Sequence, residues 1–139
     1  MTWLEPQTGA ITEPHPTALS RPYWAGCARG ELLFQRCLDC RGATHTPAVV
    51  CAHCGSQALT WEASSGRGTV YSWTTVWRPV TPAYTTPYVP IIVDVEEGWQ
   101  LVSNLVDCDH EAVRIGLPVT VRFHRTVGGT TLPYFRPAD

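Results

Sequence analysis

The sequence predicts a mainly β protein in which an N-terminal helix and a zinc ribbon precede a five-stranded OB-fold barrel. Three observations predict this fold class. Two Cys-x-x-Cys pairs lie ten residues apart, a short helical segment precedes them, and five segments rich in β-branched and aromatic residues follow them. We therefore expect an extended or flexible arm over residues 1–19, the helix and ribbon over residues 20–65, and the barrel over residues 66–137.

The N-terminal region combines an arm, a helix and the strands of the ribbon. Residues 1–19 are rich in proline and threonine, so we expect this arm to be either disordered or laid across a partner. Ser20 is the expected N-cap of a helix of about three turns, and Gly30 is its expected stop, because glycine readily adopts a positive φ. A strand over residues 31–36 should lead into the first cysteine pair, and a second strand over residues 58–62 should leave the second pair.

The four paired cysteines, Cys37, Cys40, Cys51 and Cys54, carry the strongest chemical signal in the chain. Each pair can hold one edge of a tetrahedral metal ion, and four thiolates without an open coordination position are typical of a structural Zn²⁺ site. Fe²⁺ fits the same four-sulfur cage. Two disulfides or four free thiols are the alternatives.

The C-terminal region has the alternating pattern and the turn residues of an all-β domain. The five expected strands span residues 69–78, 89–96, 100–106, 119–125 and 131–135. The second and third strands should form a hairpin around Gly98, the fourth and fifth another across Gly128-Gly129, and a short turn capped by Asp109 should connect the hairpins. Five strands match an OB-type barrel better than a sandwich, which needs about seven. Trp73 and Trp99 are expected in the barrel core.

The segment over residues 79–90 contains four prolines and two tyrosines between two strongly predicted strands. Its length and stiffness predict a structured surface loop, and such loops often carry function. Tyr84 and Tyr88 are candidate anchors for a protein interface. A loop that packs only on its own barrel is the alternative.

The charged residues exclude several functions. All ten basic residues are arginine, so no lysine can form a Schiff base, and a net charge of −2 with a pI near 6.2 argues against nucleic acid as the main partner. No apolar run has the length of a membrane span, and residues 1–16 lack the basic and apolar parts of a signal peptide. Thiolates reserved for a metal then favour a reducing, cytoplasmic location.

The other titratable residues show no catalytic constellation. The five histidines are scattered, and His45 and His53 in the ribbon are expected to be exposed or to support the cysteines, not to bind the metal. Asp94, Glu96 and Glu97 near a hairpin turn are expected to form a solvated edge. We therefore expect no catalytic residue in this chain.

This order of parts resembles the acyl-CoA-associated family that joins a rubredoxin-like zinc ribbon to an OB-fold and was long catalogued only as a domain of unknown function. The resemblance covers about Ser20 to Pro137. It depends on segments that occur in the following order: Tyr23-Trp24, Gly30-Glu31-Leu32, Gln35-Arg36-Cys37, the two cysteine pairs, Gly66 to Ser72, Pro87-Tyr88-Val89, Arg114 to Val119 and Pro133 to Pro137. One departure is Thr46-Pro47-Ala48, where the family often has a proline-arginine pair.

Members of this family look like non-catalytic partners of thiolase-superfamily enzymes, among them lipid-transfer-protein-like aldolases that act on steroid-derived β-hydroxyacyl-CoA. The resemblance therefore implies an accessory subunit of an acyl-CoA-processing complex, most simply for a retro-aldol step, that helps to bind or channel the CoA thioester. A partner of an acetoacetyl-CoA thiolase, an acyltransferase or an acyl-CoA hydratase is an alternative. A single-stranded nucleic-acid-binding OB module and a self-sufficient hydratase or hydrolase remain as further alternatives.

CoA carries phosphates and an adenine, so arginines beside aromatic surfaces are its expected contacts. Arg78, at the start of the proline-rich loop, is the first candidate for a contact with CoA or with the partner enzyme. Tyr84, Tyr88, Arg122 and Arg125 are the further candidates.

Overall fold

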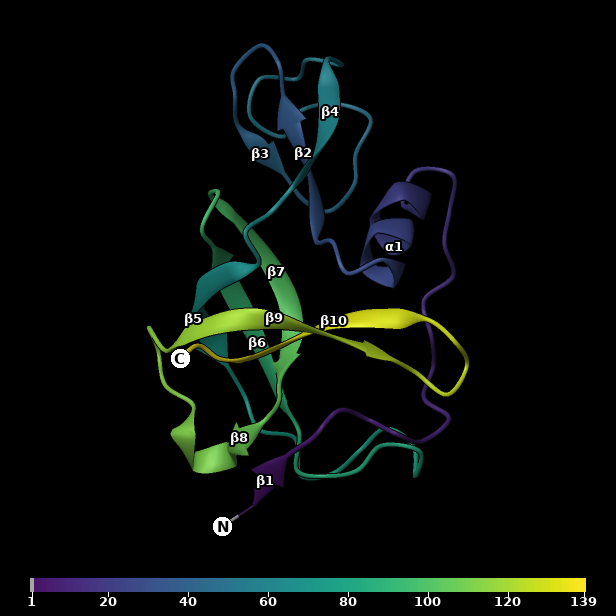
Figure 1. The fold of residues 1–139 in the computed structure, drawn as a ribbon, viewed down its shortest axis with the longest axis vertical. Coiled ribbons are helices and arrows are strands. Elements are labelled where there is room, and N and C mark those ends of the chain that lie inside the picture. The colour runs from purple at the N-terminus through teal and green to yellow at the C-terminus, as the bar shows by residue number, and fades with distance from the viewer. Residues whose placement is uncertain (1) are drawn as a thin grey trace.

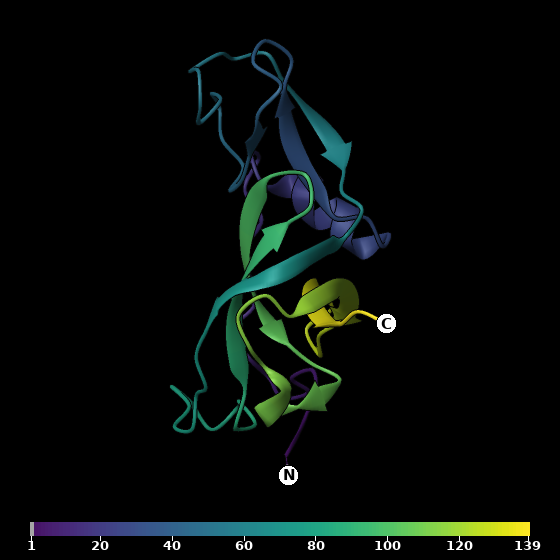
Figure 2. The same cartoon turned by 90° about the vertical axis from the view of Figure 1, so that its left-hand side faces the viewer.

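Most of the strands form a three-stranded ribbon at one end of the molecule and a closed five-stranded barrel below it, with an α-helix beside the level where the two meet (Figure 1, Figure 2). This computed structural model describes residues 2–139 and confirms the predicted mainly β fold class. The elements are, in chain order, β1 (Trp3–Leu4), α1 (Arg21–Ala28), β2 (Leu33–Cys37), β3 (Ala43–Thr44), β4 (Leu59–Ala63), β5 (Arg67–Trp73), β6 (Val89–Val95), β7 (Trp99–Leu105), β8 (Cys108–Asp109), the 3-10 helix η1 (His110–Ala112), β9 (Pro118–Arg125) and β10 (Thr131–Pro137). Within residues 2–139, no helix has the length and apolar character needed to cross a membrane.

The helix ends at the glycine stop that the sequence predicted, and its eight residues form about two turns instead of three. The N–H of Gly30 donates to the carbonyl of Cys27, and the N–H of Glu31 donates to the carbonyl of Gly26. Gly30 has a φ of 81°, so these bonds form the paired C-terminal pattern that a left-handed glycine allows. Ser20 precedes the helix as expected, but its hydroxyl accepts a bond from the Thr17 N–H and caps no helical N–H.

The ribbon consists of β2 between β3 and β4, both antiparallel to it. Four of the five β2 residues are buried, because one face packs on the ribbon loops and the lower end reaches the barrel. Phe34 is fully buried, and its ring stacks on Trp99 of the barrel with the ring centroids 5.5 Å apart. The ribbon and the barrel therefore share one hydrophobic core.

The barrel has the strand order β10-β7-β6-β5-β9, and both predicted hairpins are confirmed. Alternate residues of β6 point inward, namely Val89, Ile91, Val93 and Val95, as the period of two requires. The 3-10 turn between the hairpins is also confirmed, with the Asp109 side chain accepting the Glu111 N–H. The parallel pairing that closes the barrel between β10 and β7 has a single register pair, Phe135 with Leu105.

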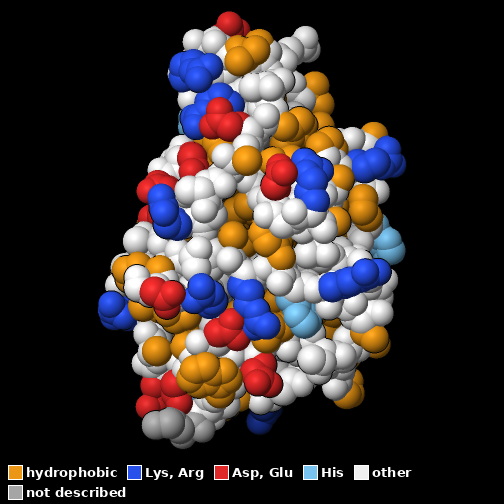
Figure 3. Space-filling model, in the orientation of Figure 1, with side chains coloured by type: hydrophobic (Ala, Val, Ile, Leu, Met, Phe, Trp, Pro, Cys, Tyr) orange, Lys and Arg blue, Asp and Glu red, His pale blue; other side chains and the backbone are white. Residues whose placement is uncertain are grey.

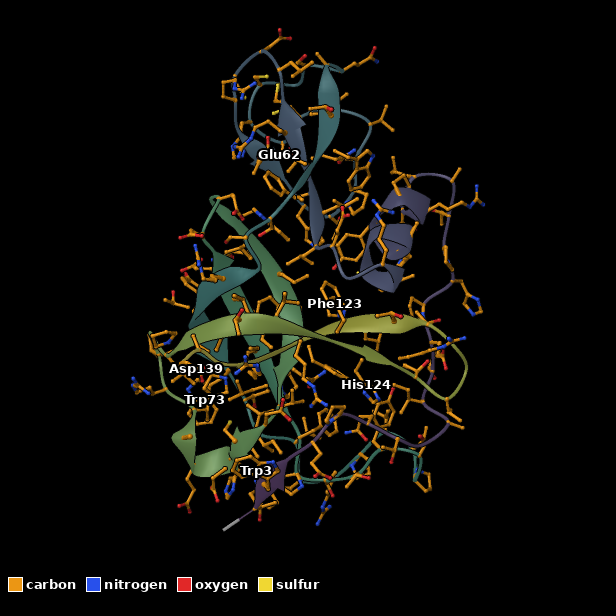
Figure 4. The ribbon with its side chains drawn as sticks, in the orientation of Figure 1. Trp3, Glu62, Trp73, Phe123, His124 and Asp139 are labelled. Atoms are coloured by element: carbon orange, nitrogen blue, oxygen red, sulfur yellow. The ribbon has the colours of Figure 1, made fainter. Side chains whose placement is uncertain are left out.

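Strand β5 ends at Trp73, earlier than the expected residue 78, so the prediction for one tryptophan was wrong. Trp99 is 5% exposed and belongs to the barrel core, as predicted, whereas Trp73 is 42% exposed. The register of β5 against β6 shifts between Val70 and Ser72, and the strand leaves the barrel soon after this irregularity. Trp73 therefore lies at the open end of the strand, on the barrel surface (Figure 4).

The N-terminal arm lies against the barrel of its own chain, which differs from both expected arrangements. Strand β1 pairs with β8 (Figure 1). Leu4 of this strand is buried. The side-chain amide of Gln7 donates to the carbonyl of Thr85 at 3.0 Å and accepts its N–H at 2.8 Å. Farther along, the Glu13 carboxylate accepts the N–H groups of Gly128 and Thr130 in the β9–β10 turn. These contacts hold the arm at three separate places.

Candidate metal centre and junction groove

The four paired cysteines meet at one point of the ribbon. Their Sγ atoms all lie within 4.8 Å of one another. Two Sγ–Sγ distances, Cys37 to Cys54 and Cys40 to Cys51, are 3.6 Å. A Zn–S bond of about 2.3 Å places the corners of a tetrahedron about 3.8 Å apart, so the arrangement fits one four-coordinate ion. The cluster is positioned for a structural metal, with no corner left for a substrate.

Backbone N–H groups point at these sulfurs and favour the thiolate form that a metal requires. The Cys40 N–H donates to Cys37 Sγ at 3.4 Å, and the His53 N–H donates to Cys51 Sγ at 3.3 Å. The N–H groups of Cys54 and His53 lower the pKa of the Cys51 thiol to about 6. The His53 ring is turned away, with Nε2 at 2.9 Å from the Ala43 carbonyl, so it supports the knuckle as expected.

His45 lies at the junction of the ribbon and the barrel, where the sequence expectation of an exposed or supporting residue was wrong. Its ring packs between Tyr23 of α1 and Trp99 of β7, at centroid distances of 5.4 and 4.8 Å. Burial lowers its pKa to about 4, so the imidazole is neutral at pH 7. No spacing rule in the sequence pointed to this contact, because the three rings come from three separate elements.

Glu97 joins the linker after the ribbon to the β6–β7 turn, so it is not part of a solvated edge. Its carboxylate accepts the Ser64 hydroxyl at 2.5 Å and the Ser65 N–H at 2.9 Å. Burial raises the pKa of Glu97, but the bonds from Ser64 and Ser65 outweigh this effect and hold its pKa below 4.5. Asp94 and Glu96 are exposed, as expected.

A groove of about 600 Å³ opens where α1, the ribbon and the barrel meet. We call it the junction groove. Its walls are Ser20, Tyr23 and Trp24 at the helix, residues 45–47 of the ribbon, Ile92 of β6, residues 100–104 of β7 and residues 132–134 of β10. Strands β7 and β10 share a single register pair, and in the groove wall a side-chain bond joins them, because the Ser103 hydroxyl donates to the Pro133 carbonyl at 2.6 Å.

The five predicted CoA or partner contacts do not converge on this groove, and none of them lines it. Arg78 is exposed at the start of the proline-rich loop. Arg122 is paired with Asp107 at 2.6 Å, and Arg125 lines a separate cavity near the end of α1. The rings of Tyr84 and Tyr88 lie together in the loop, with centroids 5.6 Å apart. The face seen in Figure 3 carries acidic and basic side chains side by side and has no continuous basic patch.

Two family models match adjacent parts of the chain. The ChsH2 rubredoxin-like zinc ribbon domain matches residues 24–60, and the ChsH2 C-terminal OB-fold domain matches residues 61–124. Among solved structures, the chain is similar to one described as Ltp2-ChsH2(DUF35) aldolase, with a TM-score of 0.83 and 34% identity over 91% of this chain and 100% of that chain. A DUF35 protein from Sulfolobus solfataricus, 11% identical with a TM-score of 0.63, has the same fold.

Curated relatives extend the comparison. The chain is 37% identical to a probable enoyl-CoA hydratase alpha subunit of Thermomonospora curvata, over 97% of this chain and 45% of the relative. It is 33% identical to the 3-oxo-4,17-pregnadiene-20-carboxyl-CoA hydratase alpha subunit of Mycobacterium tuberculosis, over 78% of this chain and 37% of that relative. This chain thus spans less than half of these two relatives. A DUF35 domain-containing scaffold protein of Methanothermobacter thermautotrophicus is 30% identical, over 70% of this chain and 74% of that protein.

The two family models together match residues 24–124, and the shared length with the scaffold protein exceeds two thirds of both chains. The fold and the cysteine cluster agree with these matches, because the ribbon precedes the barrel and the four sulfurs stand at one point. The resemblance read from the sequence is therefore confirmed, and the chain belongs to the DUF35 family of ChsH2-like proteins that join a rubredoxin-like zinc ribbon to an OB-fold.

Proposed function

We propose that this protein is a non-catalytic accessory subunit that assembles with a thiolase-like enzyme of the lipid-transfer-protein type in an acyl-CoA-processing complex. The step that we propose for the complex is retro-aldol cleavage of a β-hydroxyacyl-CoA, such as a steroid side-chain intermediate. One observation carries this proposal: the similarity to the DUF35 protein of the Ltp2-ChsH2(DUF35) aldolase extends over the whole of that chain. A scaffold role also agrees with the description of the Methanothermobacter thermautotrophicus relative as a DUF35 domain-containing scaffold protein.

The side chains of this protein support the division of labour. Within residues 2–139, no hydrogen bond links a histidine ring to a hydroxyl or a thiol, which is the contact that activates a nucleophile. Burial raises the pKa of the two cysteines outside the ribbon, to about 12 for Cys27 and about 11 for Cys108. Such thiols are poor nucleophiles at neutral pH. The reacting groups then belong to the partner.

The proposed cofactor is one structural Zn²⁺ held by Cys37, Cys40, Cys51 and Cys54. All four corners of the tetrahedron are occupied by protein sulfurs, so the ion has no position for a substrate. The CoA thioester is the proposed ligand of the complex. Arg78 is exposed and carries no ion pair within residues 2–139, so it remains our first candidate for a phosphate contact.

A hydratase subunit is a second candidate partner. It is favoured by the names of the two long relatives, hydratase alpha subunits of which this chain spans less than half. In that arrangement this module is the DUF35 part of a larger hydratase assembly. An acetoacetyl-CoA thiolase or an acyltransferase as partner, and the cytoplasm as location, remain predictions from the sequence.

Co-expression tests the proposal. We expect this chain to co-purify with a thiolase-like protein encoded nearby, and the complex to cleave a β-hydroxyacyl-CoA that neither chain cleaves alone. Elemental analysis of the complex should find about one zinc per chain. Replacing the thiolase-like protein with a hydratase subunit tests the second candidate. Full activity from the enzyme subunit without this chain would refute the accessory role.

A further inference from the structure

The junction groove has the size and the walls of a small-molecule site. Its volume of about 600 Å³ lies within the range of about 300–1,000 Å³ that is typical of ligand pockets. Rings and aliphatic side chains form most of its wall, among them Trp24, Pro47, Val102 and Leu132. Val102 is 73% exposed and therefore presents apolar surface at the groove. The groove thus offers an apolar surface enclosed by three elements.

The groove carries no formal charge at neutral pH. Among its lining residues there is no aspartate, glutamate, arginine or lysine. His45 is its one imidazole, and burial keeps that ring neutral. A phosphate group needs cationic donors, so the nucleotide end of CoA finds no partner there. Charge therefore selects an uncharged occupant, and the arginines that suit phosphates lie elsewhere on the chain.

The wall contains a polar atom that is buried without a partner. Asn104 lines the groove, and its side-chain oxygen is buried with no hydrogen-bond partner among residues 2–139. Tyr23 also lines the groove, and its side chain is 4% exposed. A buried polar atom without a partner lowers stability, so such atoms are rare unless a ligand or water completes them. The wall therefore offers specific contacts for a hydroxyl or keto group.

We propose that the junction groove binds the uncharged hydrocarbon part of an acyl group, with a hydroxyl group that donates to the Asn104 side-chain oxygen and a hydroxyl or keto oxygen directed at Tyr23. This inference rests on the proposed function in naming the acyl group of the thioester as the ligand. The groove would hold that group on the accessory subunit, while the charged end of CoA stays outside. A free neutral lipid has the same chemistry, and the experiment separates the two sources.

A fluorescent hydrocarbon probe tests the groove in the isolated, metal-loaded full chain. We expect diphenylhexatriene, which has no polar group, to bind saturably with one site per chain. Val102→Trp fills the groove and should weaken this binding about tenfold or more. Val127→Trp is the matched control, because Val127 is 69% exposed and does not line the groove. Absence of saturable binding, or equal losses in both variants, would overturn the inference.

Displacement experiments identify the ligand class. Testosterone, an uncharged fused-ring molecule with a hydroxyl group that can donate to the Asn104 oxygen, should displace the probe, and Asn104→Leu should weaken testosterone binding several-fold while leaving the probe unchanged. An acyl-CoA with a bulky alicyclic acyl group should displace the probe as well, whereas CoA without an acyl group should not. Displacement by free CoA would overturn the charge argument. Displacement by testosterone but not by acyl-CoA would assign the groove to a free lipid and refute the acyl group as its ligand.

The proposal for the groove and the proposal for the complex can be refuted independently. If the chain binds the probe but no thiolase-like protein, the proposed function fails and the uncharged-ligand site remains. If the complex forms normally but the probe does not bind, only the inference fails. If Val102→Trp prevents assembly and the wild-type chain does not bind the probe, the groove is a protein interface and the inference is wrong.

Discussion

Replacement of Glu97 with glutamine should loosen the attachment of the ribbon to the barrel by about 1–2 kcal/mol. The Glu97 carboxylate accepts two hydrogen bonds from the linker, one from the Ser64 hydroxyl at 2.5 Å and one from the Ser65 N–H at 2.9 Å. Each such bond contributes about 0.5–1.5 kcal/mol, and glutamine retains only one acceptor oxygen of the two. The partial exposure of Glu97 places the effect in the lower part of the range.

Urea unfolding of the zinc-loaded chain at pH 7 measures this loss. Glu96→Gln is the control, because the neighbouring Glu96 is exposed and only meets Arg67 at 3.5 Å, so we expect a change below about 1 kcal/mol. A double-mutant cycle of Glu97→Gln with Ser64→Ala should give a coupling energy of about 1 kcal/mol. Equal effects of the two glutamine substitutions, or a coupling energy of zero, would refute the argument.

The same bonds predict a pH dependence. Because the pKa of Glu97 is lower in the folded chain than its ordinary value of 4.5, its stabilising effect is complete above that value. The effect is lost as the pH falls through the folded-state pKa, since the protonated carboxyl is a poorer acceptor. The difference in unfolding free energy between the wild type and Glu97→Gln should therefore shrink in acid. A difference that stays constant down to pH 3 would contradict this assignment.

Three further predictions concern the metal, the junction and the arm. After chelation of the metal, or in Cys51→Ser, the amides of β2, β3 and β4 should lose their protection before the amides of the β6–β7 hairpin do. The reason is that structural zinc contributes about 10–16 kcal/mol to the folding of small zinc modules. Hydrogen exchange measures this order. His45 should titrate by NMR with a pKa of about 4. The unfolding free energy of the wild type should fall by up to about 3 kcal/mol as the pH falls from 6.5 towards 4, because only the unfolded chain takes up the proton in this range. The unfolding free energy of His45→Phe should fall less. Gln7→Ala should speed exchange of the Thr85 N–H and cost about 1–3 kcal/mol, whereas Gln57→Ala, in the ribbon, should leave that amide unchanged.

The barrel hairpins and the metal cluster could be predicted because their signals are local. Inward-facing Val89 to Val95 alternate with outward residues, and Gly98 occupies the turn with a φ of 92°. Each cysteine pair needs only a spacing of three residues to hold two corners of a tetrahedron. In both cases the interacting groups lie within one hairpin or one turn, so their spacing in the sequence is enough to predict their arrangement.

The arm, the junction and Trp73 could not be predicted because their contacts join distant parts of the chain. Gln7 and Thr85 are 78 residues apart, and the bonds between them use groups that any glutamine and any backbone possess. His45 contacts rings from the helix and from β7, so its burial depends on how the ribbon docks on the barrel. Trp73 stands in a strand pattern, but a register shift and the end of the strand decide its exposure.

The metal centre and the junction groove are physically linked, although they do not share a residue. The ribbon loop that supplies residues 45–47 to the groove wall lies between Cys40 and Cys51, whose sulfurs are 3.6 Å apart. An ion bound to these two sulfurs would close the loop and fix the position of the groove wall. The Gln35 side chain also holds the loop, because its amide accepts the Ala48 N–H and donates to the Ala48 carbonyl. The ring of His45 in turn contacts Trp99, so the position of the loop is transmitted to β7. We therefore expect a metal without an open coordination position to influence the proposed ligand binding through geometry, by setting the shape of a groove that it does not touch.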